Sequence, residues 1–258
     1  MAEFFEQICA ILAETGRKHP GDLADSPAMR EFFSASVPAK IPAPAVKIPA
    51  AENTVSPAAG KVLPPPVKKV SASLEELACS LRDCRRCPLA AGRTNMVFGK
   101  GNPHARLMFI GEGPGFEEDQ SGIPFVGKAG QLLDKMIAAM QFSLDEVYIA
   151  NVVKCRPPGN RTPMPEEIEK CVPFLKQQID IIRPEVIVAL GAVTARTLLN
   201  TATGISRLRG KWCSYENIPV MPTFHPAFLL RQESAKKEAW QDLQLVMARF
   251  GKVHKRKN

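Results

Sequence analysis

Four of the seven cysteines have the spacing of ligands to one metal centre. Cys84-Arg-Arg-Cys87 places two thiols within one turn of each other, and fifteen residues separate Cys155 from Cys171. Structural zinc sites commonly use two tight Cys-x2-Cys pairs, and only the first of these pairs is tight. Thiolates also hold iron–sulfur clusters, so spacing alone leaves zinc, a [4Fe-4S] cluster and merely buried cysteines open. A metal centre here would connect the early part of the chain to its middle.

These cysteines are expected in a reducing compartment. The start of the chain carries Glu3 and Glu6, and it has neither the basic segment nor the uninterrupted apolar run of a secretory leader. A disulfide framework is therefore not expected, because clustered cysteines in the cytoplasm usually bind metal or take part in catalysis. We expect a cytoplasmic protein that acts as a monomer and does not enter a membrane.

Composition divides the chain into an N-terminal extension, a linker, one folded domain and a short tail. Residues 1–35 begin with apolar residues at helical spacing, which predicts a short amphipathic helix that either docks on a protein partner or caps the domain. Residues 36–70 hold eight prolines and seven alanines with no aromatic residue, as in a disordered linker. The folded domain is expected at residues 71–252, followed by a basic tail at residues 253–258. Most of the net charge of +8 lies beyond the linker, which favours a polyanionic partner.

Strands and helices are predicted to alternate along the folded domain. Short apolar runs rich in valine and isoleucine indicate buried strands at Leu107–Ile110, Val147–Val153, Val186–Leu190 and Ile218–Met221. Helical patterns lie between and after them, at Ala129–Met140, Pro165–Ile182, Ala192–Leu199 and Ala235–Phe250. Pro173 predicts a kink in the second of these helices. The alternation predicts a three-layer α/β/α sandwich with a central four-stranded parallel sheet.

Polar residues follow the predicted strands. The first strand runs into Gly111-Glu-Gly-Pro-Gly115, the second into Asn151, and the last into Thr223-Phe-His-Pro226. Because the carboxyl ends of parallel strands share one edge of the sheet, Glu112, Asn151 and His225 are expected to converge there. Such a convergence of acid, amide and imidazole is typical of an active site.

Taken alone, each of these segments also has a purely structural interpretation. The glycine-rich turn matches neither the dinucleotide nor the P-loop fingerprint. Phe125 could be a hydrophobic staple at a helix entrance, or a ring that stacks on a flipped base. Asn151 could be a satisfied core residue, or its carboxamide could pair with the N3–H and O4 of uracil. Cytosine presents the opposite donor and acceptor pattern at those atoms, so this contact would discriminate between the two bases.

Together the segments resemble the uracil-DNA glycosylase superfamily, and specifically its family 4, the iron–sulfur enzymes. The resemblance covers residues from about 74 to 250. It is carried by Cys84-x2-Cys87, Gly-Glu-Gly-Pro-Gly, Pro-Phe-Val-Gly-Lys-Ala-Gly-Gln-Leu-Leu, Asn-Val-Val-Lys-Cys-Arg-Pro-Pro, Asn-Arg-x-Pro, Cys171 and His-Pro. The resemblance, rather than the spacing, favours a [4Fe-4S] cluster on Cys84, Cys87, Cys155 and Cys171, with a structural role.

The resemblance implies a role for each candidate residue. Phe125 would stack on an extruded uracil while Asn151 binds its edge, and His225 would stabilise the negative charge that develops on O2. Glu112 would position the water and favour the cationic sugar, and Glu118 would crowd C5 and so reject thymine. Leu229 or Leu230 would be a wedge that fills the gap left in the DNA. Gly113 and Arg231 complete the expected substrate-binding set.

The implied activity is a monofunctional glycosylase that removes uracil from single- or double-stranded DNA, leaves an abasic site and so starts base excision repair. Lys154 lies inside the cluster motif, which argues against its acting as a Schiff-base nucleophile. Two alternatives stay open. One is a relative that becomes covalently trapped on its DNA product, although the basic, His-containing insert of that group is missing between Pro157 and Pro163. The other is a non-catalytic iron–sulfur module that binds DNA.

Overall fold

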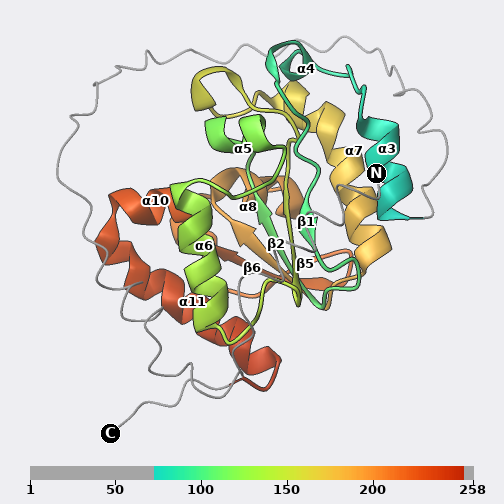
Figure 1. The fold of residues 1–258 in the computed structure, drawn as a ribbon. Coiled ribbons are helices and arrows are strands. Elements are labelled where there is room, and N and C mark those ends of the chain that lie inside the picture. The colour runs from blue at the N-terminus through green and yellow to red at the C-terminus, as the bar shows by residue number, and fades with distance from the viewer. Residues whose placement is uncertain (1–72, 253–258) are drawn as a thin grey trace, which may run out of the picture.

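The computed structural model describes residues 73–252 (Figure 1). The expected N-terminal helix, the proline-rich linker and the basic tail lie outside these residues. No helix within the described range is long and apolar enough to cross a membrane.

A mixed sheet of six strands forms the centre of the domain, in the order β1-β3-β2-β4-β6-β5. Four strands are mutually parallel, as predicted: β2 (Leu107–Gly111), β3 (Val147–Asn151), β4 (Val186–Leu190) and β6 (Ile218–Thr223). Two short strands that the sequence did not predict pair antiparallel at the edges: β1 (Lys100–Gly101) on β3 and β5 (Cys213–Tyr215) on β6. The central parallel sheet is therefore confirmed, with an antiparallel strand added at each edge.

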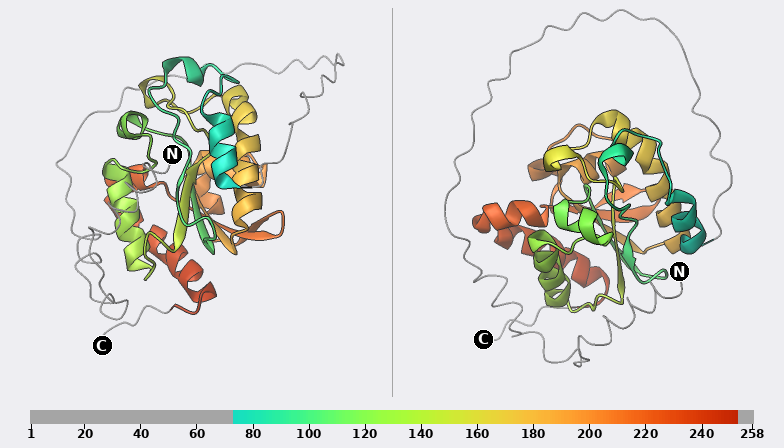
Figure 2. Two further views of the ribbon diagram at one scale, coloured as in Figure 1. Left: turned by 45° about the vertical axis from the view of Figure 1, so that its right-hand side comes forward. Right: turned by 45° about the horizontal axis from the view of Figure 1, so that its top comes forward.

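Helices cover both faces of the sheet, which confirms the three-layer sandwich (Figure 2). One face packs against α6 (Lys128–Ala139), α10 (Pro226–Arg231) and α11 (Lys236–Arg249). The other packs against α3 (Leu74–Leu81), α7 (Pro165–Ile182) and α8 (Ala192–Leu199). The shorter helical segments are α4 (Leu89–Gly92), α5 (Phe116–Ser121), α9 (Ile205–Leu208), η2 (Pro158–Asn160) and η3 (Glu233–Ala235).

Side chains of each strand alternate between the two helical layers, because successive residues in a strand point to opposite faces. Phe109 of β2 enters the core beside α6 and α11, whereas Met108 and Ile110 enter the core beside α3 and α7. All five residues of β2 are buried, as expected for a strand covered on both faces. The core thus consists of two layers that fix the sheet between them.

The longest helix, α7, has the ends that the sequence predicts. Pro165 occupies its first turn, and the Glu167 carboxylate accepts a hydrogen bond from the Met164 amide at 2.7 Å. Arg183 ends the helix in the left-handed conformation, with a φ of 52°. The helix continues through Pro173, so this proline does not end it, and the kink expected there stays a prediction.

Candidate active site

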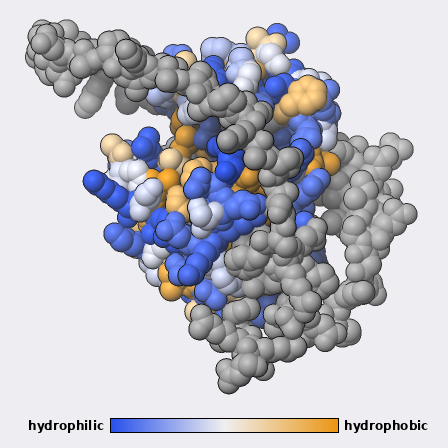
Figure 3. All heavy atoms as spheres, turned by 90° about the vertical axis from the view of Figure 1, so that its left-hand side faces the viewer, coloured by the Kyte–Doolittle hydropathy of each residue, from blue (hydrophilic) through white to orange (hydrophobic). Residues whose placement is uncertain are grey.

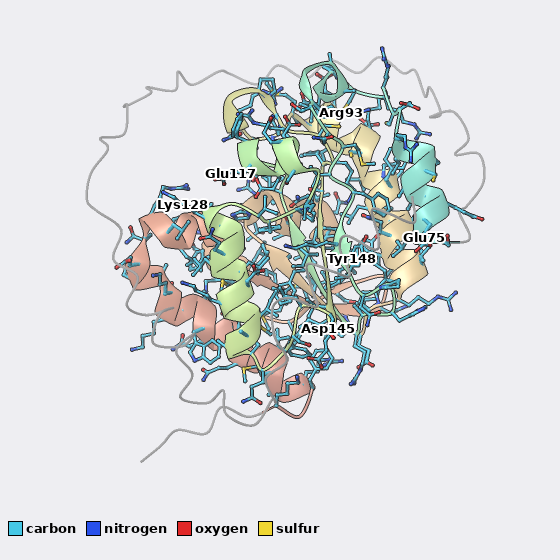
Figure 4. All side chains as sticks on the ribbon, in the orientation of Figure 1. Glu75, Arg93, Glu117, Lys128, Asp145 and Tyr148 are labelled. Atoms are coloured by element: carbon cyan, nitrogen blue, oxygen red, sulfur yellow. The ribbon has the colours of Figure 1, made fainter. Side chains whose placement is uncertain are left out.

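A cleft of about 810 Å³ lies at the carboxyl edge of the parallel strands. Its walls come from the loops after β2, β3 and β6 and from the starts of α5 and α6. In Figure 4, Glu117 of α5 and Lys128 of α6 mark its border. On the side of the molecule that carries α6 and α10, hydrophobic residues lie among mostly hydrophilic ones (Figure 3). The predicted site residues that line the cleft are Glu112, Gly113, Glu118, Phe125, Asn151, His225, Leu230 and Arg231.

Asn151 is the last residue of β3, and its side chain is almost fully buried at the bottom of the cleft. Its partner across the ladder is Gly111 of β2. A Cβ atom at Gly111 would lie 2.5 Å from Asn151 Oδ1 and 2.6 Å from the Phe125 ring, so only glycine leaves room for both. Within the described part of the chain Asn151 Oδ1 has no hydrogen-bond partner. A buried, unsatisfied amide oxygen is unfavourable unless a ligand supplies the missing donor.

Phe125 forms the wall beside Asn151, with its ring centroid 5.8 Å from that of His225. Its backbone has a φ of 54°, an uncommon conformation for a bulky residue. Two neighbours hold it there. The Lys100 ammonium of β1 donates a hydrogen bond to the Phe125 carbonyl at 3.2 Å, and Gly130 of α6 lies directly against the same peptide group. The ring orientation is therefore set by backbone contacts from two separate elements.

Glu118 of α5 connects the glycine-rich turn to the Phe125 loop. One carboxylate oxygen accepts hydrogen bonds from the Val126 and Gly127 amides, both at 3.0 Å, and the other accepts from the Gly115 amide at 3.0 Å. Three charge-assisted bonds of this kind fix the two loops relative to each other. The sequence predicts a contact of Glu118 with substrate, and the structure adds a positioning role that sequence reasoning missed.

His225 is partly buried at the start of α10, where its Nδ1 accepts a hydrogen bond from the Ala227 amide at 3.1 Å. A nitrogen that accepts from an amide cannot carry a proton, so the neutral ring must hold its proton on Nε2. Burial, together with the nearby positive charge of Arg231, lowers the pKa of His225 to about 4. At neutral pH the cleft therefore contains an uncharged imidazole that donates from Nε2.

Glu112 follows β2 and is half-buried, and burial raises the pKa of its carboxyl, partly offset by a hydrogen bond from Thr162. Thr162 belongs to a loop that is anchored from behind, because Arg161 forms a bidentate ion pair with Glu167 at 2.7 and 2.8 Å. This orienting contact was not predicted. Next to Glu112, a Cβ atom at Gly113 would lie 2.7 Å from the Val153 side chain, so a larger residue would disturb the turn.

The helix α10 corrects one prediction. Leu229 is completely buried in the core beside α6, so it cannot be a wedge that enters DNA. Leu230 and Arg231 line the cleft instead, and Arg231 is exposed. Successive residues of a helix point in directions about a quarter-turn apart, and packing on α6 selects Leu229 as the inward one.

The four predicted metal ligands line one small cavity of about 20 Å³. Cys84 and Cys87 come from the loop after α3, Cys155 from the segment after β3, and Cys171 from α7. N–H groups point at two of the sulfur atoms. Arg93 donates to Cys155 Sγ at 3.2 Å, and the Lys154 amide donates to Cys171 Sγ at 3.3 Å. Such donors fit thiolates better than neutral thiols. Burial raises the pKa of Cys171 to about 11, so a positive metal centre would have to displace its proton.

Lys154 lies between the cysteines and Asn151. Its fully buried ammonium donates to the Asn151 carbonyl at 2.8 Å and to the Gln178 side chain, and burial lowers its pKa to about 8. It does not line the cleft, so it is not placed to attack a sugar there.

Comparison with known proteins agrees with this geometry. A family model described as the uracil DNA glycosylase superfamily matches residues 98–244. The chain is 47% identical over 165 residues to the type-4 uracil-DNA glycosylase of Thermotoga maritima, which covers 62% of this chain and 85% of the relative. It is 42% identical over 188 residues to that of Archaeoglobus fulgidus, covering 70% and 94% of the two chains. A type-5 enzyme of Pyrobaculum aerophilum is 31% identical over 180 residues, covering 57% and 79%. The chain therefore belongs to the uracil DNA glycosylase superfamily and, within it, to the type-4 group.

Proposed function

We propose that the protein extrudes uracil from DNA and hydrolyses the bond between the base and deoxyribose, leaving an abasic site for base excision repair. The observation that carries this proposal is the buried Oδ1 atom of Asn151, which has no hydrogen-bond partner within the described residues and lies in the cleft that Phe125 and His225 also line. Extrusion is needed because a base inside a duplex cannot reach the bottom of a cleft.

Base recognition follows from Asn151. Its Oδ1 accepts from N3–H of uracil while its Nδ2 donates to O4, and both groups are fixed by the end of β3. Cytosine offers an acceptor at N3 and a donor at C4, so it would leave buried groups of like polarity facing each other. A site that hydrogen-bonds its ligand rejects such an analogue strongly, because the mismatched groups stay unpaired. Phe125 supplies the flat surface on which the ring stacks.

Departure of the base is assisted by His225. As the glycosidic bond breaks, negative charge develops on O2 of uracil, and the neutral Nε2–H of His225 donates a hydrogen bond to it. A preorganised donor of this type contributes about 3–4 kcal/mol to the transition state in well-studied enzymes. The Ala227 amide holds the ring in the required tautomer throughout.

Glu112 stabilises the sugar and orients the attacking water. The deoxyribose acquires positive charge as the bond breaks, and a carboxylate beside it is favourable in a partly buried site. The hydrogen bond from Thr162 fixes the carboxylate so that it can also orient the attacking water. Lys154 does not line the cleft and its ammonium is bound to the Asn151 carbonyl, which supports a monofunctional enzyme without a Schiff-base intermediate.

The remaining contacts concern DNA and specificity. Glu118 lies beside the Phe125 loop, where it would meet the methyl group of thymine, and Gly113 would meet the DNA where the turn lines the cleft. Leu230, on the exposed side of α10, is the wedge that fills the gap left by the base. Arg231 binds a phosphate on the same side. Because extrusion is easier from a mismatch, G·U sites should be processed faster than A·U sites.

The proposed cofactor is a [4Fe-4S] cluster held by Cys84, Cys87, Cys155 and Cys171, which would tie the loop after α3 to β3 and α7. The support for this site is that the four cysteines line one cavity and that N–H groups point at two of their sulfur atoms. Within residues 73–252 no group of three or more His, Cys, Asp or Glu side chains is arranged to hold a single metal ion. We expect Cys171→Ser to lose iron, cluster absorbance and thermal stability, and Cys79→Ser, which changes an exposed thiol, to keep all three.

The decisive experiment measures free uracil released from a single-uracil oligonucleotide under multiple turnover, for the protein with its cluster intact and for Asn151→Ala. Turnover by the unmodified protein and its loss in the variant, with iron content and melting temperature unchanged, would support the proposal. Binding without turnover would favour the non-catalytic module instead, and a single covalent equivalent would favour the trapped relative. Strand cleavage by β-elimination would refute the monofunctional assignment.

A further inference from the structure

Phe116 is the most exposed of the large hydrophobic side chains in residues 73–252, with 56% of its surface accessible. It is the first residue of α5 and lines the cleft together with Leu230 and Arg231 of α10. A single exposed hydrophobic residue usually needs no explanation. Phe116 differs because it lines the cleft that a DNA strand must enter to bring uracil to Asn151, and because Arg156 packs against one face of its ring.

The support is Arg156, whose guanidinium carbon lies 5.0 Å from the centre of the Phe116 ring. Arg156 is itself held, because its Nε donates to Asn160 Oδ1 at 2.7 Å. A cation placed over one face of an aromatic ring leaves the opposite face free and limits the ring's motion. A ring that is ordered before binding loses less entropy when it makes a contact. Phe116 thus presents a preorganised, flat, apolar surface at the entrance of the site.

The chemistry of the surroundings indicates what would cover that surface. Arg156 against the ring and Lys128 and Arg231 in the lining of the cleft contribute positive charge, beside the carboxylates of Glu112, Glu117 and Glu118. An aromatic ring with cations next to it is the combination that binds single-stranded nucleic acid. Extrusion of uridine leaves its neighbour in the strand without one stacking partner. An aromatic ring beside the path of the strand can replace that partner regardless of the identity of the base.

We propose that Phe116, supported by Arg156, stacks on the nucleobase next to the extruded uridine in the same strand. The inference rests on the proposed function, since it assumes that uridine enters the cleft. The protein then grips its substrate at two bases: Asn151 reads the uracil, and Phe116 holds the neighbour without reading it. The contact adds affinity for DNA but no sequence preference.

The test measures binding rather than chemistry. The probe is a single-stranded oligonucleotide with one 2′-fluoro-2′-deoxyuridine, whose fluorine slows bond breakage. Stacking of one base contributes about 1–3 kcal/mol, so Phe116→Ala should weaken binding about 5- to 150-fold, whereas Phe116→Tyr should stay close to the unmodified protein. The matched control is Trp212→Ala, which removes an exposed ring paired with Arg249 at 5.3 Å but outside the cleft, and it should bind within twofold.

A second set of probes replaces the base on either side of the fluorouridine with an abasic spacer. If Phe116 stacks on one neighbour, the spacer at that position weakens binding by the unmodified protein but has no further effect on Phe116→Ala. Independent effects that multiply, or unchanged affinity of Phe116→Ala, would overturn the inference. Inhibition by free uracil should be equal in Phe116→Ala and the unmodified protein, because the bottom of the cleft is intact. Absence of uracil release by the unmodified protein would instead refute the proposed function.

Discussion

The contact between Gly130 and the backbone of Phe125 allows a sharp test of how the Phe125 ring, proposed to stack on uracil, is positioned. A Cβ atom added at Gly130 would lie 2.1 Å from both the carbonyl carbon and the oxygen of Phe125. Carbon atoms in contact prefer about 3.5–4.0 Å, so in Gly130→Ala the Phe125 peptide must move by at least about 1 Å. Phe125 is already in a left-handed conformation, which leaves it little freedom to absorb the shift by small rotations.

The expected effect is a large loss of activity with a small change in stability. Alanine is favoured over glycine by about 1 kcal/mol inside a helix, and the clash opposes this by about 1–3 kcal/mol, so the two effects largely offset each other in the free energy of unfolding. The displacement of the ring has no such compensation. A misplacement of about 1 Å at a reacting centre can reduce the rate about 100-fold, and we expect a fall of that order in kcat/KM.

Uracil release from a single-stranded oligonucleotide and inhibition by free uracil should be measured in parallel with thermal melting. Gly92→Ala is the matched control, because Gly92 also lies in a helix and a Cβ there would meet no described atom within 4 Å. Free uracil should inhibit Gly130→Ala more weakly, and Gly92→Ala should behave as the unmodified protein. Activity of Gly130→Ala within twofold of the unmodified protein would refute the reasoning that backbone packing sets the ring.

Further predictions concern other parts of the site and the N-terminal extension. Lys100→Met removes the ammonium that holds the Phe125 carbonyl, and since hydrogen bonds to charged groups contribute about 1.5–3 kcal/mol, kcat/KM should fall at least about tenfold while Lys100→Arg recovers most of it. Because the pKa of His225 is about 4, kcat/KM should show no inflection from this residue between about pH 5 and 8. The unfolded chain takes up a proton on His225 near pH 6.5 but the folded protein does so only near 4, so its contribution to stability should decrease as the pH falls through this window, and His225→Gln should remove that decrease in urea titrations. Deleting residues 1–70 should leave uracil release from short oligonucleotides nearly unchanged if they are a docking tail, and a large loss would contradict that assignment.

The parallel sheet could be predicted because its signals are local and strong. Val186–Leu190 is a continuous apolar run between Glu185 and Gly191, and the structure confirms both ends. The edge strands β1 and β5 could not be predicted, since they contain only two and three residues and pair through their backbones. Such short strands carry no usable period, and their pairing is set by the neighbouring strand.

The candidate site divides in the same way. Glu112, Asn151 and His225 could be identified together because each lies near the carboxyl end of a predicted strand. The residues that hold the site in place could not be predicted. Lys100, for example, binds the Phe125 carbonyl from 25 positions away, and no local sequence pattern indicates such a contact. The sequence also could not decide between Leu229 and Leu230 as the wedge, because the answer depends on how α10 is rotated against α6.

Asn151 and Cys155 are separated by three residues of one buried segment, and Lys154 within it binds the Asn151 carbonyl. With Cys155 as a cluster ligand, damage to the cluster would disturb the end of β3, where Asn151 is proposed to bind the base. The expected consequence is a loss of activity, not a loss of specificity for the base.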